Sequence, residues 1–86
     1  MSYYTYIVRC ANGTLYTGWT TDVEDRVRKH NSGAGAKYTR AHLPVALLAC
    51  WQFASKSEAM SFEWKIKHLP RDKKLSMIDN HCISLG

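Results

Sequence analysis

The opening twenty residues place the strongest constraint on the fold, because two runs of strand-forming residues flank a turn signal. Tyr3 to Cys10 and Thr14 to Trp19 are rich in aromatic and β-branched residues, and Ala11–Gly13 lies between them. Such residues favour strands, and an Asn-Gly pair favours a tight turn. The sequence therefore predicts a β-hairpin.

The length of the hairpin loop decides which tyrosines share a face of the sheet, because side chains alternate along a strand. A two-residue turn would pair Tyr6 with Trp19 and send Tyr16 to the opposite face. A three-residue loop with Gly13 in the left-handed conformation pairs Tyr6 with Gly18 and puts both phenols on one face. We predict the three-residue loop, with open volume beside Gly18 that a ligand backbone could enter. The ordinary alternative is that strand tyrosines only form sheet, with their hydroxyls at its rim.

A helix is predicted directly after the hairpin. Thr21 and Glu24 have the spacing of a capping box, and Val23 and Val27 recur at helical spacing. Glycines and polar residues then break the pattern. We expect this helix to run from about Asp22 to His30.

A basic loop and an apolar strand are predicted next. The stretch from Ser32 to Pro44 contains glycines together with Lys37, Arg40 and His42, and it has no apolar period. Val45 to Phe53 is nearly all apolar, which indicates a buried central strand.

Two helices are predicted to complete the chain. Ser55 and Glu58 form a second capping box. The helix that follows has apolar residues along one stripe of its surface: Ala59, Phe62, Ile66 and Leu69. Pro70 ends that helix, and a short closing helix over the sheet is expected at about 70–80. The result is an α+β fold in the order β-β-α-β-α-α, a three-stranded antiparallel sheet flanked by helices.

Length and charge set limits on the domain organisation and the partner. With 86 residues the chain is expected to form a single domain, residues 1–86. A formal net charge of +5 favours a polyanionic partner such as nucleic acid, although it fits a merely soluble protein equally well. No signal peptide or membrane-length apolar run is present, so we expect a cytoplasmic protein without a membrane partner.

The three cysteines predict free thiols. Cys10, Cys50 and Cys82 are widely spaced, with no Cys-x-x-Cys pair to indicate a disulfide framework or a metal site. His81 adjoins Cys82, but two adjacent ligands without a second pair do not make a zinc site. We expect no zinc.

Two pairs of residues on the predicted helices could carry chemistry. Arg26 and His30 lie one turn apart, so a fixed cation and a titratable imidazole share a surface, which is also what an ordinary solvated helix face offers. Glu63 borders the apolar stripe of its helix, with Lys67 one turn on. It fits either a plain ion pair or a magnesium or manganese site completed by water and phosphate oxygens.

These segments, taken in order, resemble the GIY-YIG nuclease superfamily over about residues 3–69. Tyr4-Thr5-Tyr6 stands where the family has Gly-Ile-Tyr, and Tyr16-Thr17-Gly18 stands where it has Tyr-Ile-Gly. The helix motif and the segment with the metal-binding glutamate are matched by further residues: Arg26, His30 and Asn31, and Phe62-Glu63-Trp64. The loop at 35–40 is similar to the branch that holds the Slx1-type nucleases and small bacterial proteins made of this domain alone.

The resemblance implies an enzyme, a divalent-metal-dependent DNA endonuclease with Mg2+ or Mn2+ as cofactor, acting in DNA repair or recombination. Tyr6 would act as general base or water-activating phenol, with Tyr16 bonded nearby and Gly18 as a structural part of the site. Arg26 would neutralise the scissile phosphate, His30 would assist proton transfer, and Glu63 would hold the metal. Because a free phenol titrates near pH 10, Tyr6 would need Arg26 and the metal to lower its pKa.

Substrate choice is where the chain departs from the family pattern. Tyr4 replaces the first glycine, Thr5 and Thr17 replace the isoleucines, and nothing here supplies base-edge readout. Several basic residues are expected to contact phosphates and to position DNA without specifying sequence: Lys37, Arg40, Lys56, Lys65 and Lys67. We therefore expect duplex, branched or single-stranded DNA to be recognised by structure.

Two other functions are compatible with the sequence. One is a DNA-binding or repair-accessory module with negligible turnover, which would bind with a steep salt dependence and leave DNA intact. The other is a small protein-interaction domain with an aromatic interface built from Trp19, Trp51 and Trp64. The carboxylate of Glu63 beside a phosphate-binding surface favours the nuclease, because a pure binder would have no use for it.

Overall fold

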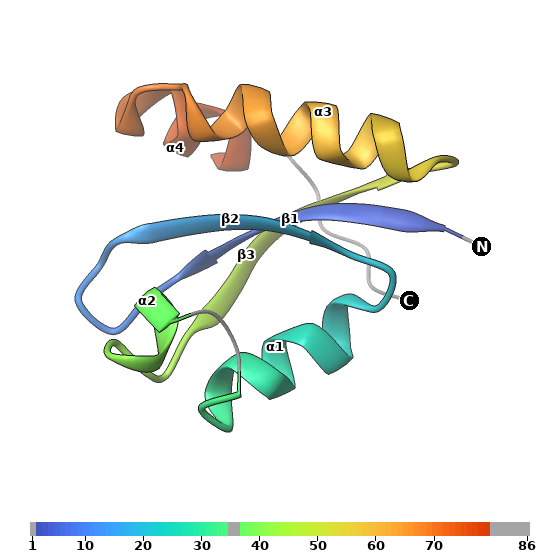
Figure 1. The fold of residues 1–86 in the computed structure, drawn as a ribbon. Coiled ribbons are helices and arrows are strands. Elements are labelled where there is room, and N and C mark those ends of the chain that lie inside the picture. Colours follow the sequence, from blue (N-terminus) through green and yellow to red (C-terminus); the bar gives the residue numbers. More distant parts are fainter. Residues whose placement is uncertain (1, 35–36, 80–86) are drawn as a thin grey trace.

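The computed structural model describes residues 2–34 and 37–79, which form a three-stranded antiparallel sheet with helices on both faces (Figure 1). In chain order the elements are β1 (Tyr3–Arg9), β2 (Leu15–Thr20), α1 (Val23–Asn31), α2 (Lys37–Arg40), β3 (Ala46–Phe53), α3 (Lys56–Lys67) and α4 (Arg71–Asp79). The predicted α+β class and the order β-β-α-β-α-α are confirmed. The single turn α2 is additional, because the predicted basic loop contains a short helix.

The hairpin has the predicted three-residue loop. Gly13 has a φ of 85°, and its N–H donates to the Cys10 carbonyl at 2.9 Å. Tyr6 then pairs with Gly18 across the two strands. The register therefore places the phenols of Tyr6 and Tyr16 on one face.

The prediction of a central third strand was wrong. The strand order is β2-β1-β3, so β1 pairs on both sides and β3 lies at the edge. Helices cover both faces of the sheet, so an edge strand can be as apolar as a central one. Apolar composition reports the covering of the faces and does not report the number of neighbouring strands.

One of the two predicted helix caps is shifted by a residue. The N-cap of α1 is Asp22 instead of Thr21, and its carboxylate accepts from the Asp25 N–H at 3.1 Å. Ser55 caps α3 as predicted, accepting from the Glu58 N–H at 3.2 Å. A carboxylate beside a hydroxyl competes well for the cap position, since Asp and Thr are both preferred there.

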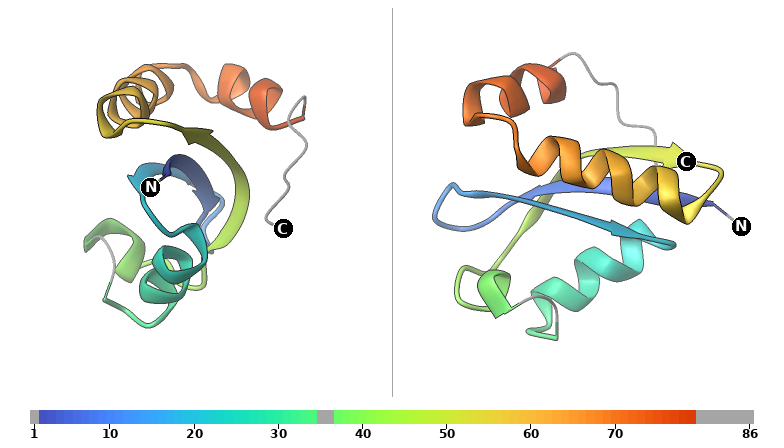
Figure 2. Two further views of the ribbon diagram at one scale, coloured as in Figure 1. Left: turned by 90° about the vertical axis from the view of Figure 1, so that its right-hand side faces the viewer. Right: turned by 45° about the horizontal axis from the view of Figure 1, so that its top comes forward.

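The two faces of the sheet have separate cores, and Figure 2 shows α1 and α3 on opposite sides of it. The α1 face buries a cluster of mainly apolar residues: Tyr6, Val8, Cys10, Val23, Val45 and Cys50. On the α3 face, Thr5 donates its hydroxyl proton to the Ala59 carbonyl at 2.7 Å. The helix α4 is joined to the hairpin loop, because Arg71 Nη2 donates to the Gly13 carbonyl at 2.9 Å.

The two cysteines among the described residues are free thiols, as predicted from the sequence. Cys10 and Cys50 are free and buried, and burial raises the pKa of both thiols. His81 and Cys82 lie outside the described residues. Between residues 2 and 79, no described helix has the length and apolar character needed to cross a bilayer.

Candidate functional site

The Tyr6 phenol lies directly over Gly18. Tyr6 is 1% exposed, and a Cβ placed on Gly18 would lie 2.6 Å from the phenol oxygen. The predicted open volume beside Gly18 is therefore wrong, because the phenol itself fills it. The missing side chain allows the aromatic ring to cross β2, which is one of the two edge strands of the sheet.

His30 is buried and holds the Tyr6 hydroxyl. Its side chain comes from the last turn of α1 and is fully buried, so the alternative of an ordinary solvated helix face does not hold for this residue. His30 Nε2 lies 3.0 Å from Tyr6 Oη, and Nδ1 lies 2.8 Å from Thr39 Oγ1 in α2. A chain of three side chains thus runs from β1 through α1 to α2.

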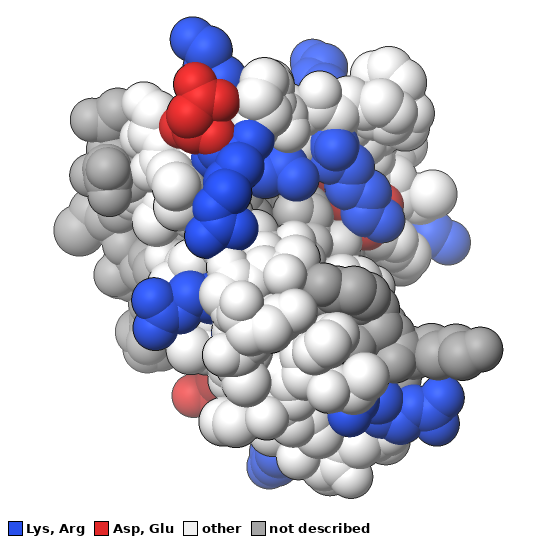
Figure 3. Space-filling model, turned by 90° about the vertical axis from the view of Figure 1, so that its left-hand side faces the viewer, with Lys and Arg blue, Asp and Glu red and all other residues white. Residues whose placement is uncertain are grey.

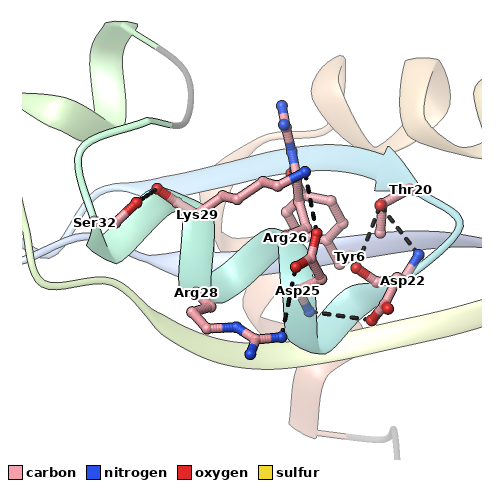
Figure 4. A network of polar contacts seen from close by, with 8 residues as sticks. All are labelled: Tyr6, Thr20, Asp22, Asp25, Arg26, Arg28, Lys29 and Ser32. Carbon is pink, nitrogen blue, oxygen red and sulfur yellow. Dashed lines mark hydrogen bonds and ion pairs between the residues drawn. The ribbon is translucent and has the colours of Figure 1, made fainter.

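Arg26 contacts the same phenol from one turn earlier in α1. Its Nε–H donates to Tyr6 Oη at 3.4 Å, and its side chain is partly buried. The neighbouring Asp25 pairs with Lys29 at 3.1 Å and Arg28 at 3.5 Å instead (Figure 4). Within residues 2–34 and 37–79, no carboxylate forms a salt bridge with Arg26. Its charge is therefore available to an anion.

These contacts allow the Tyr6 phenol to pass its proton to His30. The Nε–H of Arg26 can only donate, so the Tyr6 oxygen accepts there and has its own proton free for His30 Nε2. With Nε2 as acceptor, the proton of the neutral imidazole lies on Nδ1, facing the Thr39 hydroxyl. The phenol is thus hydrogen-bonded to a group that can take its proton.

Burial controls the two titrating groups. The pKa of Tyr6 is raised from its ordinary value mainly by burial, against the lowering effect of the Arg26 hydrogen bond and charge. Arg26 therefore acts in the expected direction, but burial outweighs it. Burial, followed by the Arg26 charge, lowers the pKa of His30. At neutral pH the protein alone therefore has a protonated phenol facing a neutral imidazole.

Tyr16 packs on the same imidazole. The rings of Tyr16 and His30 are 5.6 Å apart at 69°, and those of Tyr6 and His30 are 6.0 Å apart at 63°. Both are edge-to-face contacts of the kind aromatic rings prefer. Tyr16 therefore confines the imidazole between two phenols.

Glu63 lies at the border of the site on α3. Its side chain is 20% exposed and its Oε1 lies 3.6 Å from Lys67 Nζ, which is 47% exposed. It is close enough to Tyr6 for its charge to raise the phenol pKa. Glu63 and Lys67 therefore form the ion pair that their spacing in the sequence allowed.

The donor groups fit an oxygen-ligated ion such as Mg2+ or Mn2+ better than zinc or copper. No cluster of three or more His, Cys, Asp or Glu residues occurs in the described part of the chain. Magnesium is commonly held by one or two carboxylates, with water and substrate phosphate as the other ligands. A single partly exposed carboxylate, Glu63, meets that requirement once its pairing with Lys67 is exchanged for the ion.

The basic residues expected to contact phosphates are only partly covered by the described residues. Arg40 and Lys67 are exposed, whereas the side chain of Lys37 lies outside the described residues. Lysine and arginine side chains gather over α3 and α4 in the upper half of Figure 3, with few acidic groups among them. This is the kind of surface that phosphate backbones contact.

Two residues have roles that the sequence did not reveal. Thr39 supplies the hydroxyl beside His30 Nδ1, yet it stands in a stretch without any apolar period. Asn31 holds Val45, accepting from its N–H at 2.7 Å and donating to its carbonyl at 3.2 Å. The matched helix motif included Asn31 and the family-like loop at 35–40 included Thr39, but neither pattern revealed the group that the residue contacts.

The sequence is similar to those of known proteins. A family model described as the GIY-YIG catalytic domain matches residues 2–76. The UPF0213 protein BH0048 of Halalkalibacterium halodurans is 53% identical over 78 residues, 91% of this chain and 83% of that protein. The UPF0213 protein YsiG of Lactococcus lactis subsp. lactis is 56% identical over 82 residues, 94% of this chain and 79% of that protein.

Two solved structures have the same fold. The solution NMR structure of the UPF0213 protein BH0048 from Bacillus halodurans superposes with a TM-score of 0.60 at 52% identity, covering 92% of this chain and 84% of that chain. The solution NMR structure of the protein EF2693 from E. faecalis gives a TM-score of 0.61 at 35% identity, covering 100% and 95%.

Proposed function

Since the chain belongs to the GIY-YIG family, as a relative of the small UPF0213 proteins, we propose that it is a metal-dependent endonuclease that cleaves DNA phosphodiesters. The observation that carries this proposal is the buried contact of 3.0 Å between Tyr6 Oη and His30 Nε2, with Arg26 on the same oxygen. A phenol with a base on one side and a cation on the other can take a proton from an attacking water.

The proton path begins at the water that attacks phosphorus. As the water loses a proton to the Tyr6 oxygen, the phenol passes its own proton to His30 Nε2. Because burial raises the pKa of Tyr6, a free phenolate is disfavoured, so the two proton transfers would occur together. Because burial lowers the pKa of His30, its imidazole is neutral and ready to accept. Thr39 and Tyr16 hold the imidazole in place.

Arg26 provides the fixed positive charge. Its guanidinium would contact the scissile phosphate while Nε stays near the phenol, so the anion and the nucleophile are brought together. Asp25 pairs with Arg28 and Lys29 and not with Arg26, which supports this role.

Glu63 would hold the divalent ion, Mg2+ or Mn2+. When bound, the ion would supply charge stabilisation for the leaving 3′ oxygen. Lys67 would release Glu63 and turn to a DNA phosphate, together with Lys37 and Arg40. Such contacts position DNA without reading its bases, so we propose recognition by shape or strandedness, in DNA repair or recombination.

The alternative is a DNA-binding or repair-accessory module of the same fold with negligible turnover. The Glu63–Lys67 pair favours it, because an ammonium group already neutralises the carboxylate that an enzyme would use for metal. Such a module would bind DNA with a steep salt dependence and would not cut it.

A cleavage assay separates the two. Labelled single-stranded, duplex and branched DNA are incubated with magnesium, manganese or chelator and with the wild type, Tyr6→Phe or Glu63→Gln. We expect metal-dependent cutting that falls on the order of a hundredfold or more in both variants. Glu58→Gln, an exposed carboxylate on the same helix, is the matched control and should cut normally. A Tyr6→Phe protein as fast as wild type would refute the proposed role of the phenol, and binding without cutting would support the accessory module.

A further inference from the structure

The most exposed large apolar residue in the described part of the chain is Trp64 on α3. It is 62% exposed, and Met60, one turn earlier, is 45% exposed. An indole left in water forgoes the gain that burial would bring, so this exposed ring is a candidate contact for a ligand. Neither residue takes part in the site described above.

The position of Trp64 around α3 links it to that site. Successive residues of a helix are about 100° apart, and the face with Ala59 and Ile66 is fully buried. Going around from that face, the order is Glu63, Lys67, Met60 and then Trp64. Trp64 therefore lies on the flank of α3 that carries the candidate metal carboxylate.

His68 fixes the indole in place. The two rings are 4.1 Å apart at 32°, and His68 Nδ1–H donates to the Trp64 carbonyl at 2.8 Å. The imidazole therefore supports one face of the indole, and the exposure of the residue leaves its remaining surface to solvent. A flat, supported and exposed ring is a surface for stacking.

The charge around Trp64 indicates which kind of ring would stack on it. The second half of α3 and the first turns of α4 carry Lys65, Lys67, Arg71, Lys73 and Lys74 against Glu63 and Asp72. Figure 3 shows cations gathered over these two helices. An apolar partner would leave these charges without counterions, whereas a nucleotide supplies an aromatic base and a phosphate together.

We propose that Trp64 stacks against an unpaired base of the DNA strand whose phosphate lies between Arg26 and Glu63. Lys67 stands between the indole and the carboxylate on α3 and contacts the connecting phosphate. Bases within a duplex already stack on each other, so this contact selects single-stranded or locally opened DNA without selecting its sequence. The inference rests on the proposed function for the placement of the strand, and it concerns binding only.

Binding titrations with chelator present test the contact apart from cutting. Trp64→Ala should raise the Kd for a short labelled single strand by about fivefold or more, and change the Kd for the matching duplex by less than about twofold. Trp64→Phe should keep most of the affinity. Leu75→Ala, which removes another exposed apolar side chain at 38% exposure, is the control and should bind as wild type. A 2-aminopurine base in the strand should lose fluorescence on binding wild type and lose less on binding Trp64→Ala.

Several results would overturn the proposal. These are unchanged single-strand binding by Trp64→Ala, an equal loss for single strand and duplex, or a wild-type dimer that Trp64→Ala converts to a monomer in sedimentation. A chain that binds strands through Trp64 but never cuts would overturn the endonuclease alone. A chain that cuts while Trp64→Ala binds single strands normally would overturn this contact alone, and a chain that binds no DNA would overturn both.

Discussion

The two faces of the sheet bury polar groups in different ways. On the α1 face, the hydroxyl of Tyr6, the imidazole of His30 and the hydroxyl of Thr39 are bonded to one another in a buried chain. On the α3 face, the buried Thr5 hydroxyl is bonded to the main-chain carbonyl of Ala59. One face therefore holds side chains that can exchange protons, and the other uses a similar hydroxyl to fasten a helix to a strand.

Aromatic packing follows the same division. Phe62 of α3 lies edge-on to Trp51 at 5.1 Å and near Phe53 at 5.3 Å, so this side of the sheet is joined by rings without titrating groups. On the other side, His30 stands between Tyr6 and Tyr16. The comparison teaches that the core beneath α3 is mainly scaffold, and that the buried groups able to exchange protons are concentrated beneath α1 and α2.

The largest effect is expected for Gly18→Ala, which adds a side chain on the α1 face of the sheet, against the Tyr6 phenol. The new Cβ would lie 2.6 Å from the Tyr6 oxygen, so the buried phenol must leave its place beside His30. We expect a loss of about 1–3 kcal/mol in the free energy of unfolding, measured in urea, and a strong loss of cleavage. Gly33→Ala is the control, since nothing lies within 4 Å of its Cβ and only its φ of 87° is strained. It should lose stability and still cut; a Gly18→Ala protein that cuts normally would contradict the crossing geometry.

A smaller effect is expected from removing one buried hydroxyl on either face. Thr39→Val and Thr5→Val each delete a hydrogen bond, and each should cost about 1 kcal/mol in urea unfolding. Only Thr39→Val should slow cleavage and shift its pH profile, because Thr39 positions His30 while Thr5 holds α3. Equal rates in the two variants would mean that the faces do not differ in chemistry.

The smallest effect is expected from pH, and it comes from His30 on the α1 face of the sheet. The pKa of His30 is lowered in the folded protein, so below about pH 6.5 the unfolded chain takes up a proton that the folded chain resists. Stability should therefore be complete above that pH and should decline as pH falls toward the folded pKa. Urea unfolding between pH 5 and 8 checks this, and His30→Gln should remove that part of the decline. A wild-type curve of the same shape as the His30→Gln curve would show that His30 titrates alike in both states.

The parts of this fold that follow from local rules were predictable from the sequence. The hairpin register depends on loop length and strand alternation, so the pairing of Tyr6 with Gly18 could be stated in advance. The place of β3 at the sheet edge could not, because strand order is set by contacts between distant segments. Thr21 and Asp22 are both favourable N-cap residues, so the local sequence does not decide which of them caps α1.

The candidate site was predictable as a set of residues and not as an environment. Helical spacing placed Arg26 and His30 on one side of α1, but spacing cannot say what covers that side. The cover includes α2, whose Thr39 comes from a stretch without periodicity, and it buries His30 completely. Burial in turn outweighed the lowering of the Tyr6 pKa by Arg26.

The paired hydrogen bonds of Asn31 with Val45 join the end of α1 to the chain just before β3. They hold the two ends of the segment 32–44 together. The length of that segment can therefore change without altering where α1 and β3 meet. Lengthening a closed loop costs little additional entropy, because that cost grows only with the logarithm of loop length. This segment is therefore suited to exchange between relatives or to engineered insertions, provided that Thr39 still reaches the imidazole.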